Sequence, residues 1–432
     1  MAYSLTNGFA ANMTSAQAVS GTQRAVGSGS FVTRATATVI SSKAASKVSA
    51  PVSQSTGAQL CLECHANIAG TVANTRHAQA GVQCESCHGP AASHAANPDD
   101  PLARPSTDLT GAMCGKCHTG SRHPIYEEWK TSDHAEAVAA DRTSSSCGRC
   151  HSEAVRLSLL KNEPVQGNTS IGIACVTCHD PHVSYVWTDV LSGIRYSSQL
   201  RNPLSSTNDY FMSPLDVFAK KYNAQINICA QCHNHRGAAW TVSSAPPHRS
   251  LQYNMLLGTV GELDSGLPHY RPAAHALTIT NQCVGCHMQT AAYQSEAQPA
   301  VTGHNFKVQS YDLCLQCHPF PQLLQDFTKI VVTNQIGDVK LALDLWAVTK
   351  APLPLRTKYG TRAWEYTTPG ELSPGGAGPK AAEQTQIPVN IRKARFNLYL
   401  VQNDGSFGVH NGPFTITLLE TAEDWILEEL YK

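Results

Sequence analysis

The chain has 432 residues, with 32 Lys and Arg balanced by 32 Asp and Glu, and only 15% of its residues are charged, whereas an ordinary globular protein has about 25%. This balance argues against a basic nucleic-acid-binding surface or a polybasic membrane-binding surface. The sequence also lacks an apolar run of about 18 residues, so we predict no membrane-spanning helix.

Residues 1–58 form an N-terminal extension that contains no Cys or His and is rich in Ala, Ser, Thr, Val and Gly. This composition is typical of a disordered tail. The β-branched alternation of residues 30–48 also favours an edge strand against a partner.

Cysteine dominates residues 59–320. All 16 cysteines fall into eight C-x-x-C-H runs, here numbered motifs one to eight in chain order. This pattern is the signature of covalent haem c attachment, in which two thiols bond one porphyrin and the following His ligates its iron. Zinc sites and disulfides also use C-x-x-C pairs, but neither requires a His after every pair. The sequence predicts eight haem c groups, with thioether ligands Cys61, Cys64, Cys84, Cys87, Cys114, Cys117, Cys147, Cys150, Cys175, Cys178, Cys229, Cys232, Cys283, Cys286, Cys314 and Cys317, and proximal iron ligands His65, His88, His118, His151, His179, His233, His287 and His318.

The chain between the motifs predicts little regular structure. Gly, Pro, Asn and Ser are scattered through it, which favours turns, and too few residues separate the motifs to build an apolar core around each. We therefore expect a multihaem cytochrome c fold, mostly coil with short α-helices wrapped around a chain of haems and little β structure. Short helices are expected near residues 125–140 and 209–222, and no regular sheet.

Residues 321–432 contain no Cys and are predicted to be a helical region that supplies one iron ligand. Residues 323–348 are helix-compatible, and the Gly/Pro-rich residues 367–379 are typical of a linker. The C-terminal segment is an amphipathic helix. We expect its apolar face to pack onto the haem domain, with a partner-binding surface as the alternative. That face consists of Leu418, Leu419, Ala422, Trp425, Ile426 and Leu430.

Eleven histidines lie outside the motifs, enough to give every iron a second imidazole with three to spare. His182 follows proximal His179 by three residues, and His94 follows His88 by six. Each lies too near its own motif to reach the opposite face of that haem, so each should ligate the iron of a neighbouring motif.

Several of these runs resemble the multihaem cytochromes related to cytochrome c554 and pentahaem nitrite reductase: CESCHGPAASH, CHDPH, PPHRSLQYNMLLG, HALTITNQCVGCHM, GHNF and GVHN. The resemblance covers residues 61–318 and the stretch around His410, but not the first 58 residues or residues 320–390. His123, His235 and His269 would be spare, with His123 the alternative to His134 and His269 the alternative to His275. The resemblance implies the distal ligands His77, His94, His134, His182, His248, His275, His304 and His410.

All eight motifs end in His, whereas the resemblance implies a motif ending in Lys, or a tyrosine cross-link, at the catalytic haem of enzymatic relatives. With two imidazoles on every iron, no position is open to a substrate, and the potentials are low. We therefore predict an electron-transfer protein with no catalytic residue. The alternative is an octahaem oxidoreductase acting on nitrogen or sulfur oxyanions.

Haem attachment to C-x-x-C-H takes place outside the cytoplasmic membrane, as the resemblance implies, yet the first residues lack a secretory signal. We expect a removed export signal and an extracellular or cell-surface protein, with the periplasm as the alternative. The chain also resembles, in type, the extracellular cytochrome filaments of metal-reducing bacteria. We predict a head-to-tail homopolymer clasped by residues 1–58 that passes electrons to another redox protein or an external acceptor. A soluble periplasmic shuttle is the alternative.

Overall fold

The computed structural model describes residues 57–107, 110–208, 222–264 and 271–432. Every described residue belongs to the compact unit Ser53–Lys432. The expected edge strand at residues 30–48, the clasp and His269 lie outside the described residues, as does nearly all of the helix expected at residues 209–222.

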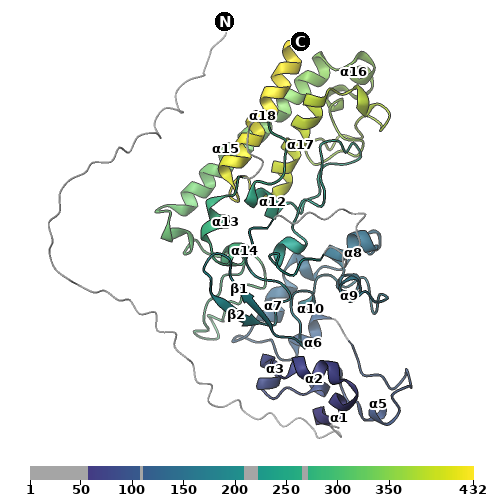
Figure 1. Cartoon of the computed structure of the whole chain (residues 1–432). Helices are drawn as coiled ribbons and strands as arrows, with labels where there is room; N and C mark the ends of the chain where they lie inside the picture. Colours follow the sequence, from purple (N-terminus) through teal and green to yellow (C-terminus); the bar gives the residue numbers. More distant parts are fainter. Residues whose placement is uncertain (1–56, 108–109, 209–221, 265–270) are drawn as a thin grey trace, which may run out of the picture. The chain divides into compact units, whose positions relative to one another are not determined.

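Short helices carry the chain up to His318 (Figure 1). They confirm the predicted fold class of short helices and coil with little β structure. The helical elements of this part are α1 (Gly57–Cys64), α2 (Ala66–Val72), α3 (Arg76–Gln79), α4 (Cys84–His88), α5 (Ala92–Ala96), α6 (Gly111–Gly115), α7 (Ile125–Lys130), η1 (Asp133–Ala135), η2 (Ala140–Arg142), α8 (Ser145–His151), α9 (Glu153–Lys161), α10 (Cys175–Cys178), η3 (Cys229–Gln231), α12 (Gln252–Leu257), α13 (Ala274–Thr278), α14 (Gln282–His287) and η4 (Cys314–Gln316).

One antiparallel hairpin corrects the expectation that no regular sheet forms. Strand β1 (Tyr185–Thr188) pairs with β2 (Arg195–Ser198), so that Tyr185 faces Ser198. The β1 side chains alternate between half-buried and exposed, which is the period of a strand. Tyr185 and Trp187 stack on the half-buried face, with ring centroids 5.8 Å apart. The hairpin is too short to change the fold class.

The helix expected over residues 125–140 is much shorter, because α7 ends at Lys130. Thr131 donates its hydroxyl to the Glu128 carbonyl at 2.7 Å, and Ser132 donates to the Trp129 carbonyl at 2.6 Å. Side-chain hydroxyls that bond nearby carbonyls compete with the helical ladder. The chain then makes the single turn η1, which carries His134.

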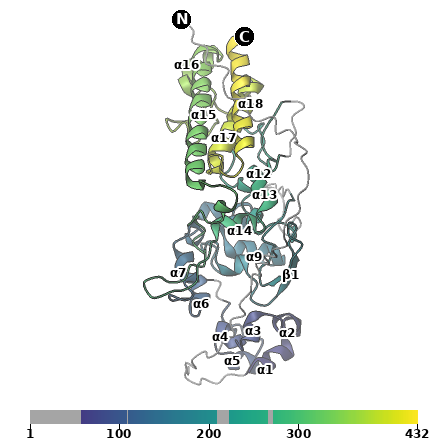
Figure 2. The ribbon, with the colours of Figure 1, turned by 90° about the vertical axis from the view of Figure 1, so that its left-hand side faces the viewer.

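Longer helices follow His318. The segment expected at residues 323–348 is one continuous helix, α15 (Pro321–Thr349), and proline at its start needs no backbone N–H partner. Helices α15, α17 (Val389–Asp404) and α18 (Gly412–Tyr431) pack side by side (Figures 1 and 2). The segment between α15 and α17 contains three short helical elements, α16 (Leu353–Tyr359), η5 (Gly360–Arg362) and η6 (Gln384–Gln386). Residues 367–379 within it are irregular, as expected for a linker.

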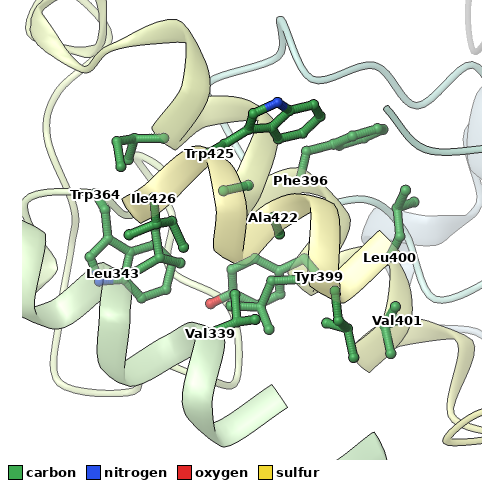
Figure 3. Close-up of a cluster of buried hydrophobic side chains, with 14 of the residues drawn as sticks. Val339, Leu343, Trp364, Phe396, Tyr399, Leu400, Val401, Ala422, Trp425 and Ile426 are labelled. Atoms are coloured by element: carbon green, nitrogen blue, oxygen red, sulfur yellow. The ribbon is translucent and has the colours of Figure 1, made fainter. Parts of the chain in front are cut away.

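The largest apolar core lies between these helices (Figure 3). On α15, Val332, Ile336, Val339 and Leu343 recur every three or four residues and are buried, as expected for one face of a helix. The apolar face of α18 packs mainly against α15 and α17 rather than onto the motif-bearing part of the chain. Burying each large side chain of this kind contributes about 1.5–3 kcal/mol.

Specific hydrogen bonds tie this helical region to the motif-bearing part. Trp425 Nε1 donates to Asp264 Oδ1 at 2.8 Å, and Asn411 Nδ2 donates to the carbonyls of Met255 and Arg271 at 3.1 and 2.8 Å. Asn411 also caps α18 by accepting the Phe414 N–H. The loop just before α18, which contains His410, is therefore fixed against the segments around motif six.

Candidate haem sites

Each C-x-x-C-H run forms a single helical turn. The N–H of the motif His donates to the carbonyl of the first Cys at 2.9 Å in motifs one, three and five, and at 2.8 Å in motifs six and eight. Residues three and four apart share one face of a helix. The turn therefore places both thiols and the imidazole of a motif on one side, as attachment to a single porphyrin requires. Within the described residues, no cysteine of the motifs is joined to another by a disulfide.

The imidazoles of the motifs lie opposite imidazoles from elsewhere in the chain. Seven motif histidines have such a partner, and each partner is one of the predicted distal ligands. The pairs, with ring-centroid distances, are His65 with His94 at 6.4 Å, His88 with His182 at 5.9 Å, His118 with His77 at 6.0 Å, His151 with His248 at 5.9 Å, His233 with His134 at 6.1 Å, His287 with His410 at 6.4 Å and His318 with His275 at 6.2 Å.

The remaining motif histidine, His179, lies near the remaining predicted ligand, His304. Burial, and after it the neighbouring His304 imidazole, lower the pKa of His179 to about 4. Burial and His233 likewise lower the pKa of His134 to about 4, and burial and Arg236 lower that of His248 to about 4. These rings are therefore neutral at physiological pH, which is the state that ligates a metal.

The ring spacing fits a metal ion between the imidazoles. A ligating imidazole nitrogen lies about 2.0–2.1 Å from zinc, so two rings on opposite sides of one ion have centroids roughly 6 Å apart. Rings in direct van der Waals stacking would be closer. A cavity of about 330 Å³ also lies beside two of the predicted ligands, His275 and His410. Among the described residues, no group of three or more His, Cys, Asp or Glu is placed to hold a metal by itself.

Hydrogen bonds at Nδ1 leave the other ring nitrogen, Nε2, free for iron. In most cases the acceptor is a backbone carbonyl or an amide oxygen, and such partners fix the orientation of a ligating ring. Nδ1 of His88 is 2.7 Å from the Ser106 carbonyl, Nδ1 of His287 is 3.1 Å from the Phe306 carbonyl, Nδ1 of His233 is 3.2 Å from Gln252 Oε1, and Nδ1 of His304 is 3.1 Å from the Thr302 carbonyl.

Glu128 positions His304 from a distant part of the chain. Its carboxylate on α7 accepts the His304 N–H at 2.8 Å and both the N–H and hydroxyl of Thr302, at 2.8 and 2.7 Å. Gly303, between them, has a φ of +76°, and a Cβ there would lie 2.5 Å from the Met288 backbone. Only glycine fits this turn without strain.

Asp180 positions His182 locally. Its carboxylate accepts the His182 N–H at 3.0 Å and forms an ion pair with Arg201 at 2.7 Å. The His182 ring lies against His88 of motif two and not against His179, which is only three residues away.

Two further histidines lie outside the pairs given above. His123 is exposed and lies near His118, and His235 is buried beside motif six. Sequence reasoning missed the positioning residues Glu128, Gln252 and Asp404. Asp180, within the run CHDPH, was visible in the sequence as a neighbour of His182. Asp404 lies six residues from His410, Gln252 lies 19 residues from His233, and Glu128 lies 176 residues from His304.

Contacts between thiols of different motifs give the order of the sites. A porphyrin attached to a motif would lie at the two thiols of that motif, so motifs with adjacent thiols would hold adjacent cofactors. The thiols of four pairs lie side by side, namely Cys61 and Cys84, Cys114 and Cys175, Cys150 and Cys232, and Cys229 and Cys283. Electrostatic proximity links Cys87 with Cys114, Cys178 with Cys232, and Cys286 with Cys314. The motifs therefore follow the order one, two, three, five, six, seven, eight, and motif four branches from motif six.

Comparisons with known proteins find similarity to multihaem cytochromes. The family model described as Cytochrome c554 and c-prime matches residues 28–89. That match begins within the first 58 residues, to which the expected resemblance did not extend. The multiheme cytochrome MtrA of Shewanella baltica (strain OS185) is 20% identical over 297 residues, and the match covers 61% of this chain and 66% of that protein.

Two solved structures are also similar. The outer cell wall cytochrome OcwA has a TM-score of 0.51 at 21% identity, covering 80% of this chain and 70% of its own. The undecaheme cytochrome from the S-layer of Carboxydothermus ferrireducens has a TM-score of 0.48 at 22% identity, covering 80% of this chain and 50% of its own. Within the described residues, no helix has the length and apolarity needed to cross a bilayer.

The helical turns at the motifs, the paired neutral imidazoles and the spaces beside them fit haem c, which supplies a one-electron iron couple when bound. The chain is similar in fold to the cytochrome OcwA and in sequence to the multiheme cytochrome MtrA. Its match to the cytochrome c554 and c-prime family, over residues 28–89, includes motifs one and two.

Proposed function

We propose that the chain conducts electrons through eight bis-histidine haem c sites arranged as a branched line. The observation that carries this proposal is the pairing of motif imidazoles with imidazoles from elsewhere in the chain at 5.9–6.4 Å. Two imidazoles would hold each iron, which supports electron transfer over substrate chemistry at the metal. The assigned thioether, proximal and distal ligands are those predicted from the sequence.

Contact between thiols of successive motifs supports conduction across the whole chain. Electron tunnelling falls steeply with distance, and the adjoining thiols keep neighbouring porphyrin edges close. Motifs one and eight are the ends of the line, and motif four is a side branch. Cys64, Cys87, Cys117 and Cys317 are exposed, so several sites lie near the surface, where a partner could approach.

We expect the mature protein to carry eight covalently bound haems. Each motif contains a helical turn, which is of 3-10 type in motifs six and eight and α-helical in the other six. Intact mass measured against the sequence mass, together with a pyridine haemochrome assay, gives the number directly. Six or fewer haems per chain would show that some C-x-x-C-H runs serve another purpose.

We further propose an extracellular or cell-surface polymer in which copies join head to tail and pass electrons to an external acceptor. OcwA, which is similar to this chain in fold, is an outer cell wall cytochrome. A zero formal net charge lowers the repulsion between copies. The outer face of α15 exposes several large apolar side chains, of a kind that often marks a protein contact. These are Leu323, Phe327, Ile330, Leu341 and Leu345.

A heterologous contact that repeats without closing gives a fibre. Residues 1–58 carry no predicted iron ligand and could make such a contact, so the polymer should depend on them. Electron micrographs of the full chain should show filaments, and deletion of residues 1–55 should abolish them while haem content stays unchanged. Filaments that persist after the deletion would remove the clasp role. A full-length protein that remains monomeric at high concentration would contradict the polymer.

A further inference from the structure

Among the described ring pairs, His410 is the imidazole bonded to a carboxylate. Its Nδ1 lies 2.8 Å from Asp404 Oδ1, and the Asp404 side chain is 1% exposed. The other described Nδ1 partners are neutral, such as the Phe306 carbonyl for His287, which lies opposite His410. Burial lowers the pKa of His410, but the charge and hydrogen bond of Asp404 outweigh it, so the pKa is raised overall.

Asp404 is held firmly in this position. It ends α17, and Gly405 follows it with a φ of +72°. Its second carboxylate oxygen accepts the Ser406 hydroxyl. Its carbonyl accepts Gln252 Nε2 at 3.3 Å, and the Oε1 of the same amide is bonded to His233 of motif six. One chain of hydrogen bonds therefore links the proximal imidazole of motif six to the distal imidazole of motif seven.

We propose that Asp404 is a positioning residue that gives motif seven the lowest reduction potential of the eight sites. A carboxylate that accepts the second N–H of a ligating imidazole makes that ring a more basic ligand. A more electron-donating ligand favours the ferric iron, and hydrogen bonding around the ligands is one way in which a protein sets a haem potential. This inference rests on the proposed function, because it requires haem at motif seven.

The position of motif seven gives this potential a consequence for the line. Its thiols adjoin those of motif six and motif eight, so it separates motif eight from the other sites. A low reduction potential at motif seven disfavours the reduced state of that site. Electron transfer between motif eight and the other sites would then have to pass through an intermediate of higher free energy.

The test is a spectroelectrochemical titration of haem-loaded Asp404→Asn. Asn keeps the size of the side chain and removes the charge. The most negative of the eight components should become more positive, with the reduced-to-oxidised ratio of that site rising about tenfold at a fixed potential, equivalent to 59 mV for one electron. Asp404→Glu should restore part of the difference. His410→Gly, which opens the same iron to carbon monoxide, assigns the shifted component to motif seven.

Asp189→Asn is the matched control. Asp189 is also buried, and its carboxylate accepts hydrogen bonds from Leu191, Ser192 and Ser205 and from no described His ring. The proposal is overturned if Asp404→Asn carries eight haems yet shifts no component, or if Asp189→Asn gives the same shift. A haem count below eight in the unaltered protein is a separate result, which contradicts the proposed function itself.

Discussion

In the His182→Ala variant, the reduced protein is expected to bind one carbon monoxide per chain, at motif two. The His182 ring lies 5.9 Å from His88, nearly parallel to it at 11°, so its removal opens one face of that iron. The thiols of Cys175 and Cys178 are untouched, and motif five should keep its haem. A carbon monoxide-induced shift of the Soret band and an unchanged intact mass are the measurements.

His123→Ala is the control for this variant, because His123 is exposed and lies opposite no motif ring in the described structure. It and the unaltered protein should bind no carbon monoxide. Loss of the motif-five haem from His182→Ala without a new carbon monoxide site would refute the ligand assignment. Carbon monoxide binding by the unaltered protein would favour the oxyanion reductase alternative.

The features that the sequence predicts well are those encoded within a few residues. The thioether and proximal ligands lie inside five-residue runs that can be read directly. The fold class follows from the scarcity of chain between motifs, and the α18 face follows from its helical period. The length of α7 depends on the hydroxyls of Thr131 and Ser132, which bond carbonyls one turn back and compete with the helical backbone hydrogen bonds. The hydrophobic periodicity of the sequence does not reveal this competition.

The order of the sites could not be predicted from the sequence, because it depends on contacts between distant motifs. Cys114 lies beside Cys175, so motif five follows motif three in the line of sites. Cys150 lies beside Cys232, so motif four branches from motif six. One support of a distal ligand is equally remote, since Glu128 holds His304 from 176 residues away. The packing of α18 against α15 and α17 depends on a helix, α17, that the sequence analysis did not single out.

The branched order predicts that losing motif five slows electron transfer from motif one to motif eight far more than losing motif four. Motif five lies between motifs three and six, and the described thiol contacts offer no way around it. Motif four touches only motif six through such contacts. Removing both cysteines of motif five, by Cys175→Ser and Cys178→Ser, should therefore leave a gap as wide as a missing porphyrin. Cys147→Ser with Cys150→Ser should leave the main line continuous.

The comparison needs an electron source at one end and a reporter at the other. A photoreductant can be attached at Asn67→Cys, an exposed position on α2 near motif one, and His275→Gly opens the iron of motif eight so that carbon monoxide traps each arriving electron. Intact mass should show the loss of one haem in each cysteine variant, which verifies that the other seven sites are filled. With the motif-five pair removed, formation of the carbon monoxide adduct should slow by orders of magnitude, and with the motif-four pair removed by a much smaller factor. Equal slowing in both variants would contradict the branch, and a larger effect from motif four would place it on the main line.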